Sequence, residues 1–471
     1  MQLLTARALD PERLAEGLAR ERALYLANHP RSAQLHSGAR DVLMGAVPMT
    51  WMLKWPGGYP LFFEAASGNR LVDVDGRTYI DFCLGDSAAI AGHGNPALTT
   101  AIARRYALGA TTMLPTGDSL WVAGELRRRF GLDVWQFTTS ATDANRWVLR
   151  MARQATSRAR VLVVNGCYHG TVDESVVALD EDGSPRSRQG NLGPAVDPTT
   201  TTRVVEWNDP DGLDRALGYG DVAAVIVEPV MTNAGMVQPE AQYHDALRRL
   251  TRRHGAWLVL DETQTWAAGP GGCTQAMSLE PDAVTLGKGM AGGIAIGTFG
   301  IRREHADTVL QGAGDLEDGG SVGGTLAANA LSLAAARVAL GEVLTDEAFG
   351  RMAGLAERYV TRMRGVFAER ALPWYVTNVG ARAEYGFCPP FPRNGSDSRQ
   401  AAHPEIDEYL HLALLNRGFL QTPFHNMILV GEPTADADVD GLIQALIDAL
   451  DLVLPVGGAS GMPARDRSLD A

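Results

Sequence analysis

Apolar strand-like runs that alternate with helical stretches restrict the fold of this chain more than any other feature. Six such runs lie in the middle of the chain: VWQFTT (134–139), RVLVVNG (160–166), AAVIVEPV (223–230), AWLVLDE (256–262), AVTLG (283–287) and GTFGI (297–301). Stretches with helical patterning, such as DANRWVLRMARQA and YHDALRRLTRRHG, separate them. Strands that are apolar throughout are covered on both faces, so the pattern predicts an α/β fold with a mostly parallel central sheet.

The length of the chain predicts two domains. At 471 residues it exceeds one ordinary hydrophobic core. Either one large domain with a smaller one attached or two comparable domains would suit this length. We expect the first arrangement, with the sheet in the large domain and a smaller α+β domain that is assembled from both ends of the chain. The predicted boundaries give an N-terminal helix with a small-domain segment, the large domain, the C-terminal part of the small domain and a loose tail, at residues 1–95, 96–334, 335–455 and 456–471.

Local signals predict elements outside the sheet. Asp10 and Pro11 have the residue types of a helix N-cap and of a first helical position, so a helix is expected there. The dipeptide Asp75-Gly76 predicts a turn between two short strands of a β-meander. The alanine-rich stretch ANALSLAAARVALGEVL predicts a long helix that leaves the sheet domain. Beyond it, one strand-like stretch and two helical stretches follow: WYVTNVGARAEYGF, HPEIDEYLHLALLNRG and DADVDGLIQALIDALDLVL.

The charge balance and the cysteine pattern exclude several classes of protein. A net charge of −13 and a pI near 5.3 disfavour a nucleic-acid groove, because phosphates require a basic surface. The four cysteines are widely spaced without a CxxC pair, so no disulfide framework and no metal site is expected, and a cytoplasmic location is predicted. No apolar run reaches the roughly eighteen residues of a membrane-spanning helix. Small metabolites remain as the expected partners.

Lys288 stands out because lysine is rare in this chain. Of 42 basic residues, only Lys54 and Lys288 are not arginine. Arginine stays protonated and cannot act as an amine nucleophile, whereas a desolvated lysine can. Lys288 directly follows the apolar run AVTLG and has glycines around it, at the edge where parallel sheets bind ligands. We therefore predict covalent chemistry at Lys288, and a surface or gate position for Lys54.

Two further strand ends carry residues that suit one cofactor. Asp261 ends the run AWLVL, where it would either cap the next helix or keep a pyridinium nitrogen protonated, as a carboxylate does in pyridoxal phosphate enzymes. Ser140, Ala141 and Thr142 follow VWQFTT and open a helix, and the first N–H groups of a helix bind phosphate. An amine nucleophile, a carboxylate and a phosphate cradle together predict pyridoxal 5′-phosphate as the cofactor.

Six motifs stand in the same order as in a known enzyme family. They are TTSATDANRWVLRMAR (138–153), GCYHG (166–170), VEPVMTNAGMVQP (227–239), DETQT (261–265), LGKGMAGG (286–293) and GGTLAANALSLAAA (323–336). On these motifs the chain resembles the class III, or omega-type, pyridoxal phosphate-dependent aminotransferases of fold type I, in the branch that includes glutamate-1-semialdehyde aminomutase. The resemblance covers roughly residues 68–430 and implies the fold and the cofactor of that family.

The resemblance implies roles around the cofactor ring. Lys288 would form the Schiff base, and Asp261 would pair with the pyridinium nitrogen. Gln264 would approach the phenolic oxygen of the ring. Tyr168 would stack on the ring, with His169 behind it.

The resemblance also assigns residues to the phosphate end of the cofactor. Ser140, Ala141 and Thr142 would hold the phosphate, and Glu228 would lie among the cofactor-binding residues. Thr325, in a glycine-rich turn, would reach the phosphate in a second subunit. This last role implies a homodimer with shared active sites.

Three functions remain open on these residues. The leading hypothesis is an aminotransferase that moves an amino group from an amino acid or amine to an oxo acid, with Lys288 as general acid and base. The alternative is an aminomutase, similar to glutamate-1-semialdehyde 2,1-aminomutase, or a racemase with the same parts. A non-catalytic protein that kept the fold is the third, and the joint presence of Lys288, Asp261, Gln264 and Thr325 argues against it. A small-molecule amino donor and an oxo-acid acceptor are therefore the expected partners.

Substrate recognition is the least constrained part of the site. Ala141 and Thr263 stand where relatives usually have glycine and valine, so no specific substrate carries over. Arg382, in a strand-like run with little polar company, is the predicted carboxylate-binding residue, because a guanidinium holds a carboxylate through two parallel hydrogen bonds. Trp51 and Trp55 would either wall the pocket or anchor the N-terminal segment.

Overall fold

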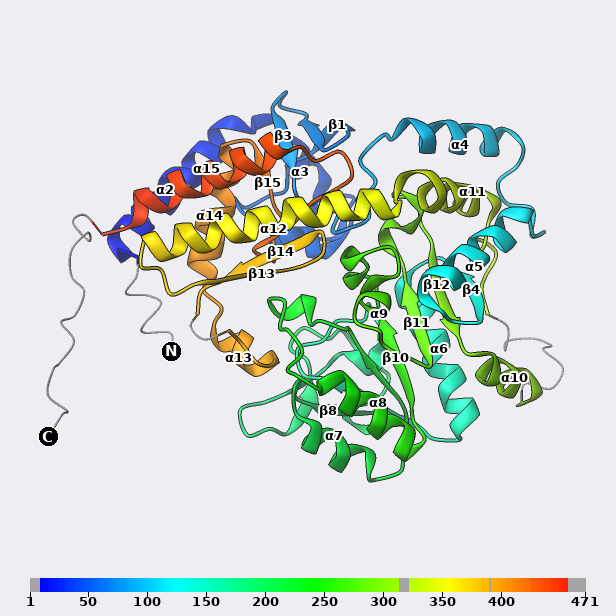
Figure 1. Cartoon of the computed structure of the whole chain (residues 1–471). Coiled ribbons are helices and arrows are strands. Elements are labelled where there is room, and N and C mark those ends of the chain that lie inside the picture. Colours follow the sequence, from blue (N-terminus) through cyan, green and yellow to red (C-terminus); the bar gives the residue numbers. More distant parts are fainter. Residues whose placement is uncertain (1–8, 313–321, 389–390, 456–471) are drawn as a thin grey trace, which may run out of the picture.

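The computed structural model describes residues 9–312, 322–388 and 391–455, and a seven-stranded sheet lies at the centre of its larger part (Figure 1). In their order across the sheet, the strands are β4 (Val134–Thr138), β12 (Gly297–Ile301), β11 (Ala283–Leu286), β10 (Trp257–Asp261), β9 (Val222–Val227), β5 (Arg160–Val164) and β8 (Thr202–Val205). All pairs are parallel except those of β12, which runs antiparallel to both of its neighbours. The predicted α/β fold with a mostly parallel sheet is confirmed.

Helices cover both faces of this sheet. The helix α6 (Ala141–Thr156) follows β4, and α8 (Tyr243–His254) connects β9 to β10; they lie on opposite sides of the strands in Figure 1. Four of the strands are buried at every position, which is why their sequences are apolar throughout. The short strand β8 had no predicted counterpart, because its sequence TRVV is too short and too polar to stand out.

A smaller α+β part is built from both ends of the chain. A first sheet joins β1 (Phe63–Ser67), β2 (Arg70–Asp73) and β3 (Thr78–Asp81) to β15 (Phe419–Leu420). A second sheet consists of β13 (Tyr375–Val379), β14 (Arg382–Gly386) and β16 (Met427–Leu429). The helices α2 (Pro11–Asn28), α12 (Asp346–Glu369), α14 (Pro404–Asn416) and α15 (Asp436–Val453) pack beside these sheets (Figure 1). The structure thus contains the predicted small α+β part built from both ends of the chain, whereas the exact domain boundaries stay predictions.

The local signals are followed closely at three places. The carboxylate of Asp10 accepts hydrogen bonds from the N–H groups of Glu12 and Arg13, at 3.0 and 3.2 Å, and so caps α2. Gly76, with φ of +82°, forms the turn between β2 and β3. The alanine-rich stretch forms α11 (Ala330–Val338) and a π-helical turn that ends at Val343.

Other expectations differ from the structure or lie outside it. The long helix α12 occupies a segment for which no element was predicted. The predicted loose tail, residues 456–471, lies outside the described residues. Among the described helices, none combines the length and the apolar character that a membrane crossing requires.

Candidate active site

A cavity of about 290 Å³ lies at the carboxyl ends of β4, β10 and β11. Eight of the predicted site residues line it: Ser140, Ala141, Thr142, Tyr168, Glu228, Asp261, Gln264 and Lys288. The register explains this meeting, because Asp261 at the end of β10 pairs with Thr285, three residues before Lys288. Parallel strands bring the residues that follow them to one edge of the sheet.

Lys288 begins a 3-10 turn directly after β11 and has a left-handed backbone, with φ of +51°. Its Nζ lies 2.5 Å from Oδ2 of Asp86, which also accepts a hydrogen bond of 2.8 Å from Nε2 of Gln264. Burial favours the neutral form of Asp86, but the charges of Lys288 and Arg382 outweigh it and hold the pKa of Asp86 below its usual value. The amine and the carboxylate therefore form an ion pair.

Asp261 is buried at the end of β10, and each of its oxygens accepts a hydrogen bond. Its Oδ2 accepts from Nδ2 of Asn145 at 2.9 Å and from Nδ1 of His169 at 3.0 Å, while Oδ1 accepts from the N–H of Thr263 at 3.1 Å. The next helical turn has Gln264 as its N-cap residue, so Asp261 does not serve as a helix cap. Its carboxylate instead faces the cavity and His169.

The pair of Asp261 and His169 is charged. Burial lowers the pKa of His169, but the interactions with Cys167 and the hydrogen bond to Asp261 raise it to about 10. Burial raises the pKa of Asp261, but the hydrogen bonds from His169, Thr263 and Asn145 bring it below its usual value. Asp261 therefore remains a carboxylate, as a partner of a protonated ring nitrogen must.

The N-terminus of α6 opens into the same cavity. Ser140 is the N-cap residue, and its Oγ accepts a hydrogen bond of 3.2 Å from the N–H of Asp143. Thr142 accepts one of 3.3 Å from the N–H of Thr171. Gly170, with φ of +77°, packs so tightly here that a Cβ would lie 2.0 Å from Oγ1 of Thr142. The free N–H groups and the dipole of such a helix end suit a phosphate.

The residues present fit pyridoxal phosphate. An amine, an ionised carboxylate and a helix N-terminus line one cavity, as the aldehyde, the ring nitrogen and the phosphate of this cofactor require. Oγ1 of Thr263 and Oδ1 of Asn145 are buried without a hydrogen-bond partner among the described residues. Buried polar atoms of this kind are rare unless a further group satisfies them.

The remaining lining residues differ in exposure. Tyr168 is 48% exposed, and burial of part of its ring raises its pKa. Glu228 is buried; its carboxylate accepts hydrogen bonds from the hydroxyl of Thr232 and from Nδ2 of Asn233. Burial raises the pKa of Glu228. His169 lies behind the lining, in contact with Asp261.

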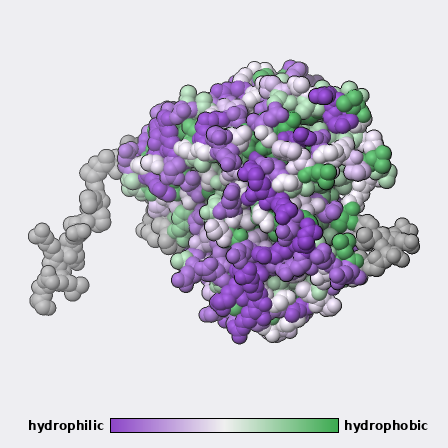
Figure 2. Space-filling model, turned by 45° about the vertical axis from the view of Figure 1, so that its right-hand side comes forward, coloured by the Kyte–Doolittle hydropathy of each residue, from purple (hydrophilic) through white to green (hydrophobic). Residues whose placement is uncertain are grey.

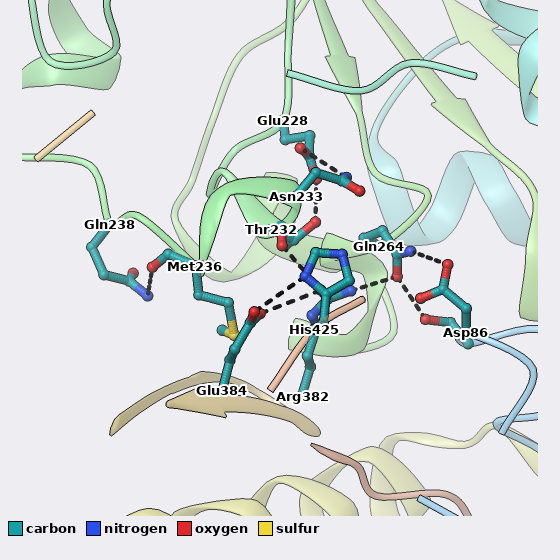
Figure 3. A network of polar contacts seen from close by, with 12 residues as sticks. Asp86, Glu228, Thr232, Asn233, Met236, Gln238, Gln264, Arg382, Glu384 and His425 are labelled. Atoms are coloured by element: carbon teal, nitrogen blue, oxygen red, sulfur yellow. Dashed lines mark hydrogen bonds and ion pairs between the residues drawn. The ribbon is translucent and has the colours of Figure 1, made fainter. Parts of the chain in front are cut away.

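Gln264 joins the cavity to Arg382 (Figure 3). Its Oε1 accepts hydrogen bonds of 2.8 Å from Oγ of Ser87 and from Nη1 of Arg382. Arg382 is 0% exposed; it also donates to the carbonyl oxygen of Thr232 at 3.0 Å and lies 3.5 Å from Glu384. With no exposed face, its guanidinium would have to leave these partners in order to hold a substrate carboxylate.

Three other predicted residues are not among those that line the cavity in the described chain. Trp51 is exposed and meets Phe424 edge to face at 5.7 Å, and Trp55 is half-buried against the core. Thr325 is exposed on the turn before α11. Their roles toward substrate and toward a second subunit stay predictions.

Sequence reasoning missed Asp86 and Asn145. Asp86 follows the strand β3 of the small sheet, more than 200 residues before its partner Lys288, so no local pattern joins them. Asn145 sits one helical turn after Ala141 on α6 and points its amide at Asp261. The one sequence signal for Asn145 is that it places an amide on the inner face of α6, the helix whose N-terminus is the proposed phosphate-binding site.

Comparison with known proteins agrees with this geometry. The family model described as aminotransferase class-III matches residues 54–365. A glutamate-1-semialdehyde 2,1-aminomutase from Chloroflexus aggregans is 32% identical over 439 residues, which cover 89% of this chain and 98% of the relative.

Solved structures give the same result. A glutamate-1-semialdehyde-aminomutase from Pseudomonas aeruginosa PAO1, in complex with PMP, is 46% identical with a TM-score of 0.92, covering 95% of this chain and 100% of that one. An omega-transaminase from Sphaerobacter thermophilus is 28% identical with a TM-score of 0.81, covering 89% and 97%. The chain belongs to the aminotransferase class-III family of pyridoxal phosphate-dependent enzymes.

Proposed function

We propose that this enzyme is an aminomutase, which moves an amino group between neighbouring carbons of one substrate of the glutamate 1-semialdehyde type. The observation that carries the proposal is the similarity, at 46% identity over 95% of the chain, to a glutamate-1-semialdehyde-aminomutase. The sequence alone favoured an aminotransferase, and that function now stands second. Its support is the weaker similarity to an omega-transaminase, at 28% identity.

Each residue at the cofactor site has its own proposed role. Bound pyridoxal phosphate supplies an electron sink for the carbon that loses its proton. Lys288 provides the amine at Nζ that bonds to the cofactor and that carries the proton between reacting carbons. Asp261, whose pKa is lowered by the hydrogen bond from His169 against the effect of burial, would hold a proton on the ring nitrogen of the bound cofactor. Gln264 and Tyr168 orient the ring.

The N-terminus of α6 is the proposed binding site for the phosphate group of the cofactor. Ser140, Ala141 and Thr142 line this part of the cavity and would hold the phosphate through N–H groups and hydroxyls. Glu228 is buried at the cavity wall, where burial raises its pKa. The substrate contacts of Arg382, Trp51 and Trp55 and the location of the enzyme in the cytoplasm stay predictions.

Exposed apolar residues on the surface support a homodimer with shared active sites. The face of the molecule that is drawn in Figure 2 is largely polar but carries apolar patches toward its right-hand side. Large apolar residues are exposed on and between α4 (Pro96–Ala107) and α5 (Gly117–Phe130), namely Tyr106 on α4, Leu108, Met113 and Leu114 between the two helices, and Leu120 on α5. Leu326, beside Thr325, is exposed as well. Such patches favour coverage by a second copy, which would bring Thr325 to the partner's cofactor.

The need for an added oxo acid separates the two functions. An aminomutase returns the amino group to the same carbon skeleton, so glutamate 1-semialdehyde should be converted without any acceptor. An aminotransferase requires a 2-oxo acid for turnover. A panel of α-, β- and ω-amino acids and amines, with and without an oxo acid, should show acceptor-independent turnover for the semialdehyde. Strict dependence on an acceptor for every substrate would contradict the proposal.

A further inference from the structure

Asp86 is the residue that holds the reactive amine in this structure. Its Oδ2 lies 2.5 Å from Nζ of Lys288 and accepts a second hydrogen bond from Gln264. Its other oxygen, Oδ1, is buried and has no hydrogen-bond partner among the described residues. Asp86 therefore keeps room for one more donor.

The orientation of the Asp86 side chain is fixed by Gln264 and by the hydrogen-bond partners of Gln264. Oε1 of Gln264 accepts hydrogen bonds from Ser87 and from the buried Arg382, so its Nε2 is the end that faces Asp86 (Figure 3). The backbone of Asp86 and Ser87 is left-handed, with φ of +53° and +81°. A non-glycine residue adopts this conformation only where its surroundings enforce it, which often happens at functional sites.

Lys288 cannot serve as the partner of Asp86 at every stage of a reaction. When Nζ is bonded to the cofactor, the ion pair with Asp86 loses the ammonium group that it has here. The side chain of Asp86 is only 24% exposed, and a carboxylate in such a place is unfavourable without a cation. Arg382 keeps a favourable charge near Asp86, but its hydrogen bonds go to Gln264 and Thr232, so it donates none to Asp86. A cationic group of the ligand can therefore take the place of the ammonium group as a hydrogen-bond donor to Asp86.

The proposed substrate offers such a cation. A substrate of the glutamate 1-semialdehyde type carries an amino group next to its carbonyl carbon, so one nitrogen has to be held while the neighbouring carbon reacts. We propose that Asp86 is the ammonium-binding residue of the site, which holds Nζ of Lys288 in one stage and the non-reacting amino group of the substrate in the other. This assignment of a substrate group rests on the proposed aminomutase function.

The test measures ammonium binding without turnover. Lys288→Ala removes the amine and leaves Asp86 to accept methylammonium, which is added to the full chain without cofactor and followed by calorimetry. Asp86 and methylammonium should form a saturable complex. The double variant Lys288→Ala with Asp86→Asn should bind about tenfold or more weakly, because a neutral amide forms a weaker hydrogen bond to a cation. Lys288→Ala with Asp86→Glu is the matched control and should restore part of the affinity.

Two results would overturn the proposal. One is equal affinity for methylammonium with and without Asp86→Asn, and the other is no binding to a Lys288→Ala chain that circular dichroism shows to be folded. If the double variant does not fold, the single variant Asp86→Asn decides: KM for the amino substrate should rise by about tenfold or more, and an unchanged KM contradicts the assignment. Since the calorimetry needs no oxo acid and no turnover, its result stands even if the enzyme proves to be an aminotransferase.

Discussion

Nδ1 of His169 lies 3.0 Å from Oδ2 of Asp261, and both side chains are buried at the end of β10. Burial lowers the pKa of the histidine, but its interactions with Cys167 and with Asp261 raise it to about 10. Burial raises the pKa of the aspartate, and the hydrogen bond from His169 helps to bring it below its usual value. A protonated histidine thus keeps a buried carboxylate charged in the pH range in which most enzymes work. The strength of the electron sink depends on this charge, because Asp261 is the proposed partner of the ring nitrogen.

The stability of the protein should therefore depend on pH through His169. A histidine whose pKa is raised stabilises the fold fully below its ordinary pKa of 6.5, and this contribution disappears as the pH rises through about 10. His169→Asn keeps a donor near Asp261 but no charge. Urea unfolding of both proteins should show a difference of a few kcal/mol near pH 6 that shrinks toward pH 10. A difference that stays constant over this range would mean that His169 is neutral.

Asp261→Asn should keep most of the cofactor binding and lose most of the catalysis. The amide cannot hold the ring nitrogen protonated, so the half-reaction should slow by roughly 10²-fold or more. Stopped-flow absorbance of the cofactor measures that rate directly. Wild-type rates in this variant would show that another group faces the ring.

Lys288→Arg should abolish turnover, because a guanidinium cannot form the bond to the cofactor. Borohydride should bleach the yellow protein and fix the cofactor to Lys288, which peptide mass spectrometry identifies. Lys54→Arg is the matched control, since Lys54 is the other lysine of the chain, and it should remain active. A reduced adduct on Lys54, or near-normal turnover of the Lys288→Arg variant, contradicts the assignment.

Gly170→Ala should weaken cofactor binding. A Cβ at this position would lie 2.0 Å from Oγ1 of Thr142, so the phosphate cradle must open. Gly190 is the matched control: its φ of +84° is similar to the +77° of Gly170, but a Cβ there meets nothing within 4 Å. Both variants should lose about 1 kcal/mol or more of stability from backbone strain, and only Gly170→Ala should lose cofactor affinity in a fluorescence titration. Equal cofactor affinities would place the phosphate elsewhere.

Two inactive variants should complement each other if the sites are shared. In a mixed dimer of Lys288→Ala and Thr325→Glu, one site carries both lesions and the other carries neither. Random mixing should restore at most about a quarter of the wild-type activity. Mixed dimers that form, as native mass spectrometry would show, but stay inactive would leave Thr325 without its proposed role.

The site residues at the strand ends were predictable because each of them directly follows an apolar run in the sequence. Asp261 and Lys288 each follow an apolar run, and a parallel sheet brings the ends of such runs together whatever the rest of the chain does. Ser140 was predictable for the same reason, since it follows β4 and opens α6. Ser140, Asp261 and Lys288 thus follow from the apolar runs and from the residues at their ends, whereas Tyr168, Glu228 and Gln264 were assigned to the site by the resemblance to a known family.

Contacts between the two parts of the chain were not predictable. Asp86 comes from the loop after β3 and meets Lys288 across 202 positions, and Arg382 comes from β14 and meets Gln264 across 118. An arginine in an apolar strand signals a buried ion or a ligand, and the sequence does not say which. The reversed direction of β12 also left no trace, because a strand buried on both faces has the same composition in either direction.

The number of product molecules per active site tests the central claim most directly. Purified enzyme, loaded with its cofactor, is mixed with an excess of glutamate 1-semialdehyde in the absence of any oxo acid, and the product is quantified by mass spectrometry. An aminomutase predicts many molecules of the isomeric amino ketone per site, since the amino group never leaves the cycle. A yield that stops at about one per site and resumes only when a 2-oxo acid is added would show an aminotransferase and contradict the account.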